Sequence, residues 1–229
     1  MEAILAGMFI SLGAIVYLKV GGVVGAVLFS VGLMSVLYTE AHLFTGKARL
    51  LVSKEIAPEE LFKIWCGNVI GVCAIAYLMA ATPLGVIIAE PAAAIVGVRI
   101  ANGFLTNVIM GIGCGILMTS AVEGTTTTEN WLFAIIPVAV FILIGFNHCV
   151  ADMFYIAICG GLGIETLIPT TIGNIIGCCV SPMLKKLVLT TDKPLEKEPE
   201  ETRKIGFSSP PNIKLKEEKQ EQKPQEKLK

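Results

Sequence analysis

Long apolar runs without charged residues recur along the first 184 residues of the chain. A run of about 17–25 apolar residues is long enough to cross the hydrocarbon core of a bilayer as an α-helix. The pattern predicts six membrane-spanning helices, over residues 3–18, 20–39, 64–89, 100–122, 130–151 and 166–184. We therefore expect an all-α membrane protein that crosses the lipid bilayer six times.

Composition agrees with this pattern. Hydrophobic residues make up 54% of the 229 positions, which is more than an ordinary soluble domain contains. No basic segment precedes the first apolar run and no small-residue cleavage site follows it, so we expect no cleavable signal peptide.

The chain changes character after the last apolar run. Residues 190–229 carry many charges and several prolines but almost no apolar side chains, so they cannot bury a core. We predict a six-helix transmembrane channel domain over residues 1–189, followed by a charged, disordered cytoplasmic tail over residues 190–229.

Basic residues indicate the orientation, because Lys and Arg concentrate at the cytoplasmic ends of membrane spans. Lys19 and Arg99 fall on one predicted side of the membrane. A larger group falls on the other side: Lys47, Arg49, Lys54, Lys63, Lys185 and Lys186. This distribution predicts a multi-pass protein of the cytoplasmic (inner) membrane with both termini in the cytoplasm.

Two motifs indicate an internal duplication. Residues 66–74 read "CGNVIGVCA" and residues 172–180 read "IGNIIGCCV", so both contain Gly-Asn-X-Ile-Gly. The two histidines, His42 and His148, are separated by the same number of residues as the two motifs. Each half then holds three spans, and because three is odd, the second half enters the membrane from the opposite face. The sequence predicts an inverted 3+3 repeat, which is typical of transporters.

Each half also contains a polar interruption of an apolar run. The first is "TEAHLFTGK" over residues 39–47, and the second is "GFNHCVAD" over residues 145–152. Backbone that leaves the helical conformation inside a membrane must be buried in protein or line a watery cavity. We therefore predict two broken helices that meet at a pore or solute site near the membrane centre.

These interruptions resemble those of the formate/nitrite transporter family. "HLFTGK" is similar to the family's first break, and "GFNHCVADMF" is similar to its second. "AGMFISLGA", "IPVAVF" and "GNIIG" resemble parts of the first, fifth and last spans, in the expected order. The resemblance covers about residues 1–186.

The resemblance implies a homopentamer of aquaporin-like protomers, each with its own pore. It implies transport of small monovalent anions such as formate, nitrite, lactate or hydrosulfide, coupled to protons in at least some members. Thr45 and His148 match the threonine and the central histidine of the family motifs. The family's apolar constrictions map onto Phe29, Leu33, Phe44 and Phe141.

Physical chemistry suggests a role for the central histidine. An anion in hydrocarbon is very costly, and protonation would let it cross as a neutral acid. Histidine suits this task because its unperturbed pKa lies near neutral pH. We expect His148 to exchange a proton with the solute or bind it, with Thr45 as an uncharged hydrogen-bond donor.

Departures from the family motifs keep four further residues among the candidates for anion binding. His42 stands in place of an acidic residue, Lys47 of an asparagine, Asn147 of a glutamate and Asp152 of an asparagine. A position that carries a lysine in many members is Asn130 here. Lys47 could supply that missing charge or pair with Asp152, because buried opposite charges are expected to pair.

Two alternatives remain. One is an aquaporin-like channel for small neutral solutes, or for hydrosulfide or ammonia. The other is a membrane enzyme or a non-transporting assembly protein. The sequence disfavours an enzyme because it shows no nucleophile–base pair, metal-ligand cluster or phosphate loop. The seven cysteines fit neither a zinc site nor a disulfide framework. We expect a non-enzyme without cofactor or metal and without a nucleic-acid partner.

Overall fold

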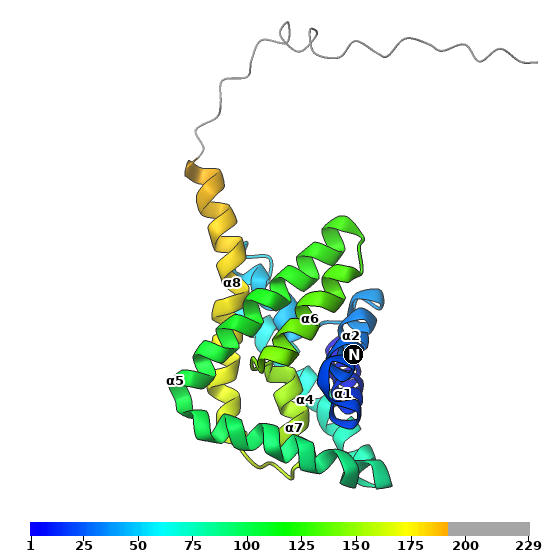
Figure 1. Ribbon diagram of the computed structural model, residues 1–229. Helices are drawn as coiled ribbons and strands as arrows, with labels where there is room; N and C mark the ends of the chain where they lie inside the picture. The colour runs from blue at the N-terminus through cyan, green and yellow to red at the C-terminus, as the bar shows by residue number, and fades with distance from the viewer. Residues whose placement is uncertain (192–229) are drawn as a thin grey trace, which may run out of the picture. The chain divides into compact units, whose positions relative to one another are not determined.

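The computed structural model describes residues 1–191, and these contain helices and connecting turns but no strand. The α-helices are α1 (Glu2–Val20), α2 (Gly22–Tyr38), α3 (Phe44–Ala48), α4 (Pro58–Ala80), α5 (Pro83–Thr128), α6 (Leu132–Ile144), α7 (Cys149–Ile158) and α8 (Leu167–Thr191) (Figure 1). Two short 3₁₀ helices, η1 (Arg49–Leu51) and η2 (Ile164–Thr166), join them. The all-α expectation is confirmed for the described part of the chain. The predicted tail lies almost entirely outside it.

The helices account for most of the predicted membrane spans. By length and composition, α1, α4, α5 and residues 164–188 can each cross a membrane. Helices α6 and α7 together can form a further span that is bent by 55° at its break. Helix α2 is apolar but has only 17 residues.

The third predicted span is wrong in its boundaries. The apolar run over residues 64–89 includes the end of α4 and the beginning of α5. Pro83 cannot donate the backbone hydrogen bond that would continue α4. The side chain of Thr82 caps α5 by accepting a hydrogen bond from the Gly85 amide at 3.4 Å.

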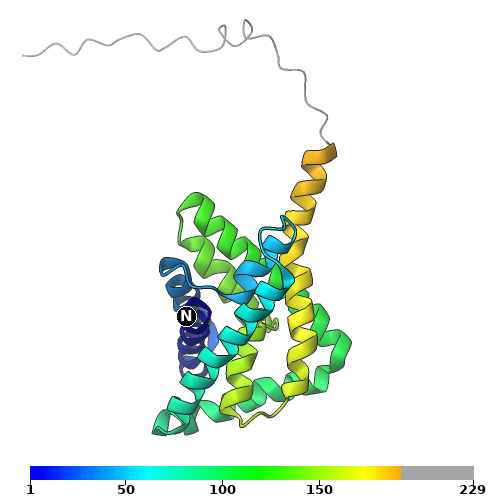
Figure 2. The ribbon, with the colours of Figure 1, turned by 180° about the vertical axis from the view of Figure 1, so that it is seen from behind.

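Helix α5 changes direction sharply at Gly103. This residue has φ 69° and ψ −176°, a conformation that glycine adopts without the steric cost of a Cβ. Figures 1 and 2 show the first part of α5 running across one end of the molecule and the second part running along the other helices. Arg99, which precedes this bend, lies at the break between α6 and α7, where it donates to the Gly145 carbonyl.

Two helix pairs approach each other closely at matching glycines of the two similar sequence motifs. A Cβ on Gly71 of α4 would lie 2.0 Å from the Ile4 carbonyl oxygen of α1. A Cβ on Gly177 of α8 would lie 2.1 Å from the Ile112 carbonyl oxygen of α5. Both glycines therefore permit backbones to pack almost in contact, as membrane helices often do. The glycines at these two motif positions therefore serve helix packing.

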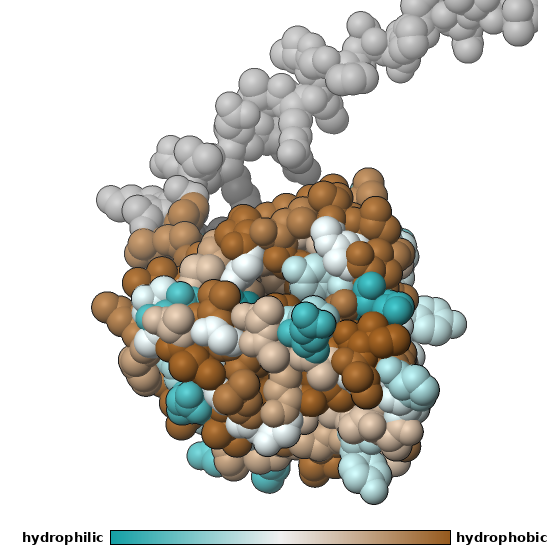
Figure 3. Space-filling view, turned by 60° about the horizontal axis from the view of Figure 1, so that its bottom comes forward, coloured by the Kyte–Doolittle hydropathy of each residue, from teal (hydrophilic) through white to brown (hydrophobic). Residues whose placement is uncertain are grey.

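The outer surface is rich in apolar side chains. One side of α2 exposes Val24, Leu28 and Val31, whereas the other side buries Phe29 and Leu33. The face drawn in Figure 3 is predominantly hydrophobic, with separate hydrophilic residues among the apolar ones. Such a surface suits contact with lipid or with other protein subunits rather than with water.

Candidate functional site

The two polar interruptions form two breaks in the helices. At the first break, α2 ends at Tyr38 and α3 begins after Leu43. At the second break, α6 ends at Ile144 and α7 begins after His148. Leu43 and His148 are both in the extended conformation and occupy the N-cap positions of their short helices. The predicted interruptions are confirmed as breaks in regular helix.

Asn68 of α4 supports the first break. Its side-chain oxygen accepts a hydrogen bond from the Phe44 amide at 2.9 Å. Its side-chain nitrogen donates to the carbonyl oxygens of Ala3 at 2.7 Å and of His42 at 3.0 Å. One buried amide thus satisfies backbone groups that the break leaves without helical partners.

Asn174 of α8 does the same at the second break. Its side-chain oxygen accepts from the Cys149 amide at 2.8 Å. Its side-chain nitrogen donates to Gly111 at 2.9 Å and to Asn147 at 2.8 Å, in both cases to the carbonyl oxygen. Asn68 and Asn174 thus each join the backbone of a break to neighbouring helices.

These hydrogen bonds show that His42 and His148 do not occupy equivalent positions in the two breaks. Asn68 donates to the His42 carbonyl and Asn174 to the Asn147 carbonyl, so His42 and Asn147 are structurally equivalent. The accepted bonds make Phe44 equivalent to Cys149 in the same way. Leu43 and His148, which lie between these residues, are therefore equivalent as well. The equal spacing of His42 and His148 is therefore one residue out of structural register. Helix α3 begins after an apolar residue, and α7 begins after an imidazole.

The two breaks meet in a buried contact between Thr45 and His148. The Thr45 Oγ1 lies 2.9 Å from the His148 Nε2. The Ala151 amide donates to His148 Nδ1 at 3.2 Å, so Nδ1 acts as an acceptor and the ring proton is assigned to Nε2. Nε2–H then donates to Thr45, which leaves the threonine hydroxyl proton free to donate to a solute. The structure brings these two predicted residues together.

Two phenylalanines lie beside this contact. The Phe141 ring stacks on the His148 ring, with centroids 5.6 Å apart and an angle of 22° between planes. Phe29 meets Phe141 edge to face at 6.1 Å. Both phenylalanines are 1% exposed, so they close the space around the imidazole with apolar rings.

Two cavities lie on either side of this cluster. The first, which we call the Arg99 cavity, has a volume of about 310 Å³ and includes Arg99, Phe141, His148 and Asp152 in its lining. The second, the Lys47 cavity, has a volume of about 250 Å³ and is lined by Leu33, Leu43 and Lys47, among others.

Helix α5 contributes to both cavities and shows their separation. Residues up to Met110 line the Arg99 cavity, whereas Val122 and Thr126 line the Lys47 cavity. The distance along a helix from residue 110 to residue 122 is about 18 Å. The barrier between the cavities therefore lies beside residues 110–122, in the part of α5 that follows Gly103.

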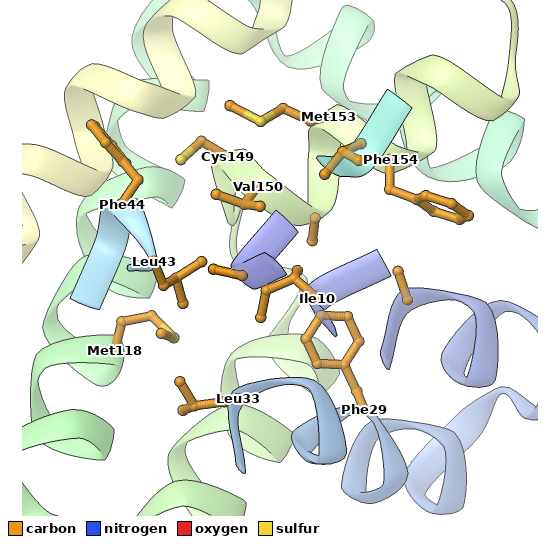
Figure 4. Packing of buried hydrophobic residues seen from close by; sticks show 14 of the residues in the cluster. Ile10, Phe29, Leu33, Leu43, Phe44, Met118, Cys149, Val150, Met153 and Phe154 are labelled. Atoms are coloured by element: carbon orange, nitrogen blue, oxygen red, sulfur yellow. The ribbon is translucent and has the colours of Figure 1, made fainter. Parts of the chain in front are cut away.

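Phe44 does not occupy the position predicted for it. Its side chain lines a separate apolar pocket with Trp65, Ile168 and other residues of α4 and α8. Leu43, one residue earlier, lines the Lys47 cavity with Leu33. Figure 4 shows the Phe44 side chain directed away from Leu33 and Leu43. Because neighbouring residues at a helix start point in different directions, a shift of one residue moves the side chain to another surface.

Two other candidates are turned away from both cavities. Asn147 is fully buried, and its side-chain nitrogen donates to Asn107 at 2.8 Å and to Thr170 at 3.3 Å. His42 is partly exposed and pairs with Glu2 at 3.0 Å. Asn147 fastens the second break to its neighbours, and His42 fastens the first break to the start of α1.

Asp152 pairs with Arg99 and not with Lys47. The Arg99 Nε lies 3.7 Å from Asp152 Oδ2 in the Arg99 cavity, whereas Lys47 lines the other cavity. Sequence reasoning used Arg99 only as an indicator of orientation. A buried aspartate in an apolar segment was a signal that a cation should lie nearby, but the identity of the cation depended on the bend at Gly103.

Comparisons with known proteins agree with this architecture. Residues 1–186 match the family described as formate/nitrite transporter. The chain is 32% identical over 210 residues to the uncharacterized transporter YrhG of Bacillus subtilis, covering 77% of this chain and 79% of YrhG. It is 30% identical over 193 residues to a probable formate transporter of Methanothermobacter thermautotrophicus, covering 68% and 70% of the two chains.

A solved structure is similar as well. It is described as a pentameric formate channel with formate bound, and it superposes with a TM-score of 0.69 at 27% sequence identity. The similarity covers 83% of this chain and 96% of that one. The broken helices, the apolar surface and these matches together show that this chain is an integral membrane protein belonging to the formate/nitrite transporter family.

Proposed function

We propose that this chain forms a homopentamer in the cytoplasmic membrane and that each protomer conducts small monovalent anions and their weak acids. Formate is the first candidate, because relatives and a similar solved structure carry formate in their names. Nitrite, lactate and hydrosulfide belong to the same class of small solutes. The observation that carries the proposal is the buried Thr45–His148 contact between two cavities.

We further propose that the membrane domain consists of two inverted halves of three spans each. The first half would comprise α1, the α2–α3 pair and α4. The second would comprise the long part of α5 after Gly103, the α6–α7 pair and α8. Equivalent roles of Asn68 and Asn174 support this division. A hydrogen bond of 3.4 Å joins Trp65 to Thr171, which are equivalent in the repeated motif.

The orientation that we propose places the Lys47 cavity on the cytoplasmic side. Arg49 and Lys185 both lie at that end of the protein, where each pairs with Glu123. Basic residues favour the cytoplasmic face of a membrane protein. Both chain termini would then lie in the cytoplasm, and the Arg99 cavity would open to the other side.

In this mechanism, a solute passes from one cavity to the other through the apolar cluster. Phe29, Phe141 and the leucines Leu33 and Leu43 exclude water, which makes a bare anion costly. The Thr45 hydroxyl offers a hydrogen bond without a fixed charge. His148 would exchange a proton, so that the solute crosses the centre as an uncharged acid. To gain that proton at Nδ1, His148 must first release the Ala151 amide, which couples protonation to a change in the first turn of α7.

Uptake of radiolabelled formate into proteoliposomes, at acid and neutral external pH, tests this proposal. We expect saturable uptake that rises with acidity, and a loss of about tenfold or more in His148→Ala and Thr45→Val. His42→Ala is the matched control, because it removes the other histidine at a position that faces neither cavity. Wild-type pentamers without uptake at either pH, or His148→Ala with unchanged uptake and pH dependence, would contradict it.

A further inference from the structure

The Arg99 cavity contains a buried pair of opposite charges. Arg99 is 7% exposed and Asp152 is 2% exposed, and the Arg99 Nε faces the Asp152 Oδ2 at 3.7 Å. Among the described residues that line this cavity, Arg99 and Asp152 are the two that carry formal charges. The electrostatic potential of the cavity therefore depends mainly on this pair.

Backbone contacts fix the position of the guanidinium. Arg99 Nη1 donates to the Gly145 carbonyl at 2.9 Å, and Nη2 donates to the Phe146 carbonyl at 3.5 Å. The Arg99 carbonyl in turn accepts a hydrogen bond from the Asn107 side chain at 2.7 Å. Arg99 thus joins the end of α6 to Asp152 in the first turn of α7, and the guanidinium cannot leave the cavity without breaking its bonds to the two carbonyls.

Neither charge alone would suit a cavity that solutes must enter and leave. An unpaired buried arginine would attract anions and hold them, and an unpaired aspartate would repel them. Conduction requires binding that is favourable enough for entry and weak enough for release. A paired arginine and aspartate largely cancel at a distance and present a dipole to the solute.

We propose that Arg99 and Asp152 act as a compensated pair that sets the electrostatic potential of the Arg99 cavity, and through it the affinity of this entrance for anions. The proposal rests on the proposed function for its consequence on transport, but the potential itself can be measured without a substrate. In this proposal, Asp152 is a specificity-determining residue that lowers the affinity of the cavity for anions.

A substrate-independent experiment uses a thiol probe in the cavity. Thr106 is exposed and lines the Arg99 cavity, so Thr106→Cys places a reactive group there. The rates of its modification by an anionic and by a cationic methanethiosulfonate reagent are compared in pentamers, by intact mass. The same protein with Thr106 retained gives the background from the native cysteines.

Removing one charge should shift the ratio of anionic to cationic rates in a direction set by the charge that remains. We expect Asp152→Asn to raise the ratio about tenfold and Arg99→Gln to lower it about tenfold, as expected for a unit charge at short range in a partly screened site. The double variant Arg99→Gln/Asp152→Asn should return near the wild-type ratio, and Arg99→Lys should keep it. If Arg99→Gln does not fold, the isosteric Asp152→Asn alone decides.

Transport gives a second readout. In Asp152→Asn, the KM for formate should fall about tenfold and the maximal rate should also fall, because anions leave the cavity more slowly. Permeability to neutral formamide should stay unchanged. An unchanged rate ratio in Asp152→Asn, or a shift toward the cationic reagent, would overturn the inference. Absent formate uptake by the wild-type protein would instead overturn the proposed function and leave the thiol measurement to decide the pair.

Discussion

The two breaks share a backbone framework but differ in their chemistry. Each is held by one asparagine that accepts from the first amide of a short helix and donates to two carbonyls, Asn68 at the first break and Asn174 at the second. At the N-cap, however, the first break has Leu43 and the second has His148. Both breaks therefore have the same kind of support, but only the second has a polar side chain at the N-cap.

The surroundings of the two breaks differ in the same sense. Glu40 at the first break is exposed and adopts φ 54°, an uncommon conformation for a residue with a side chain. Gly145 at the second break adopts φ 84°, which glycine tolerates well. Arg99 and Asp152 also lie at the second break, where Arg99 donates to the Gly145 carbonyl and faces Asp152. The first break is thus partly exposed and includes a residue with an uncommon φ, whereas His148 at the second break is buried.

The largest effect should come from filling the close helix contacts. Gly71→Ala and Gly177→Ala each place a Cβ about 2 Å from a backbone carbonyl oxygen, so the helices must separate. We expect each to destabilise the protein by about 3 kcal/mol and to lower the temperature at which pentamers are lost in detergent. Gly97→Ala, which meets no atom within 4 Å, is the control and should have little effect. A large loss in only one of the first two variants would break the symmetry of the framework.

The next effect concerns the asparagines. Asn68→Ala and Asn174→Ala should each cost about 2 kcal/mol, because both leave a buried amide and two carbonyls without their partner. Thermal stability in detergent is the measurement, with Asn102→Ala at the partly exposed wall of the Arg99 cavity as the control. Similar losses would sharpen the comparison between the breaks, and a loss at Asn174 alone would show that the first break does not need its support.

The smallest effect is expected on formate uptake, in a comparison of variants of Leu43 and Phe44. Leu43→Ala should raise formate uptake about threefold, because it shortens an apolar side chain of the Lys47 cavity. Phe44→Ala should leave uptake per pentamer nearly unchanged, because Phe44 lines another pocket. Initial rates in proteoliposomes with matched protein content give the answer. A rise in Phe44→Ala without one in Leu43→Ala would restore the assignment made from the sequence motif.

Sequence reasoning found the elements more reliably than their boundaries. The apolar runs predicted the helices, but the run over residues 64–89 concealed the turn between Ala80 and Pro83. Thr82 followed by a proline was a local signal for that turn. Glu90 and Arg99 made the start of α5 resemble a connecting loop, whereas it is helical throughout. Hydrophobicity reports burial in lipid and is a weak guide to the direction of the chain.

The same division holds for the site. Motifs alone selected Thr45, His148, Phe29, Leu33 and Phe141. In the structure, the first, second, third and last of these form a buried contact cluster, and Leu33 lines the Lys47 cavity. The motifs did not distinguish Leu43 from Phe44, because the sequence does not show in which direction each of two adjacent side chains points.

The sequence by itself determined the all-helical membrane class, the two breaks and the family, because apolar length and short motifs are local properties. Only the tertiary structure decided which residues of different helices contact or correspond to one another. It set Arg99 beside Asp152, matched His148 with Leu43 and turned Asn147 and His42 away from both cavities. These contacts depend on the bend at Gly103 and on a shift of one residue between the two breaks. Such features are fixed by packing between helices that lie far apart in the chain.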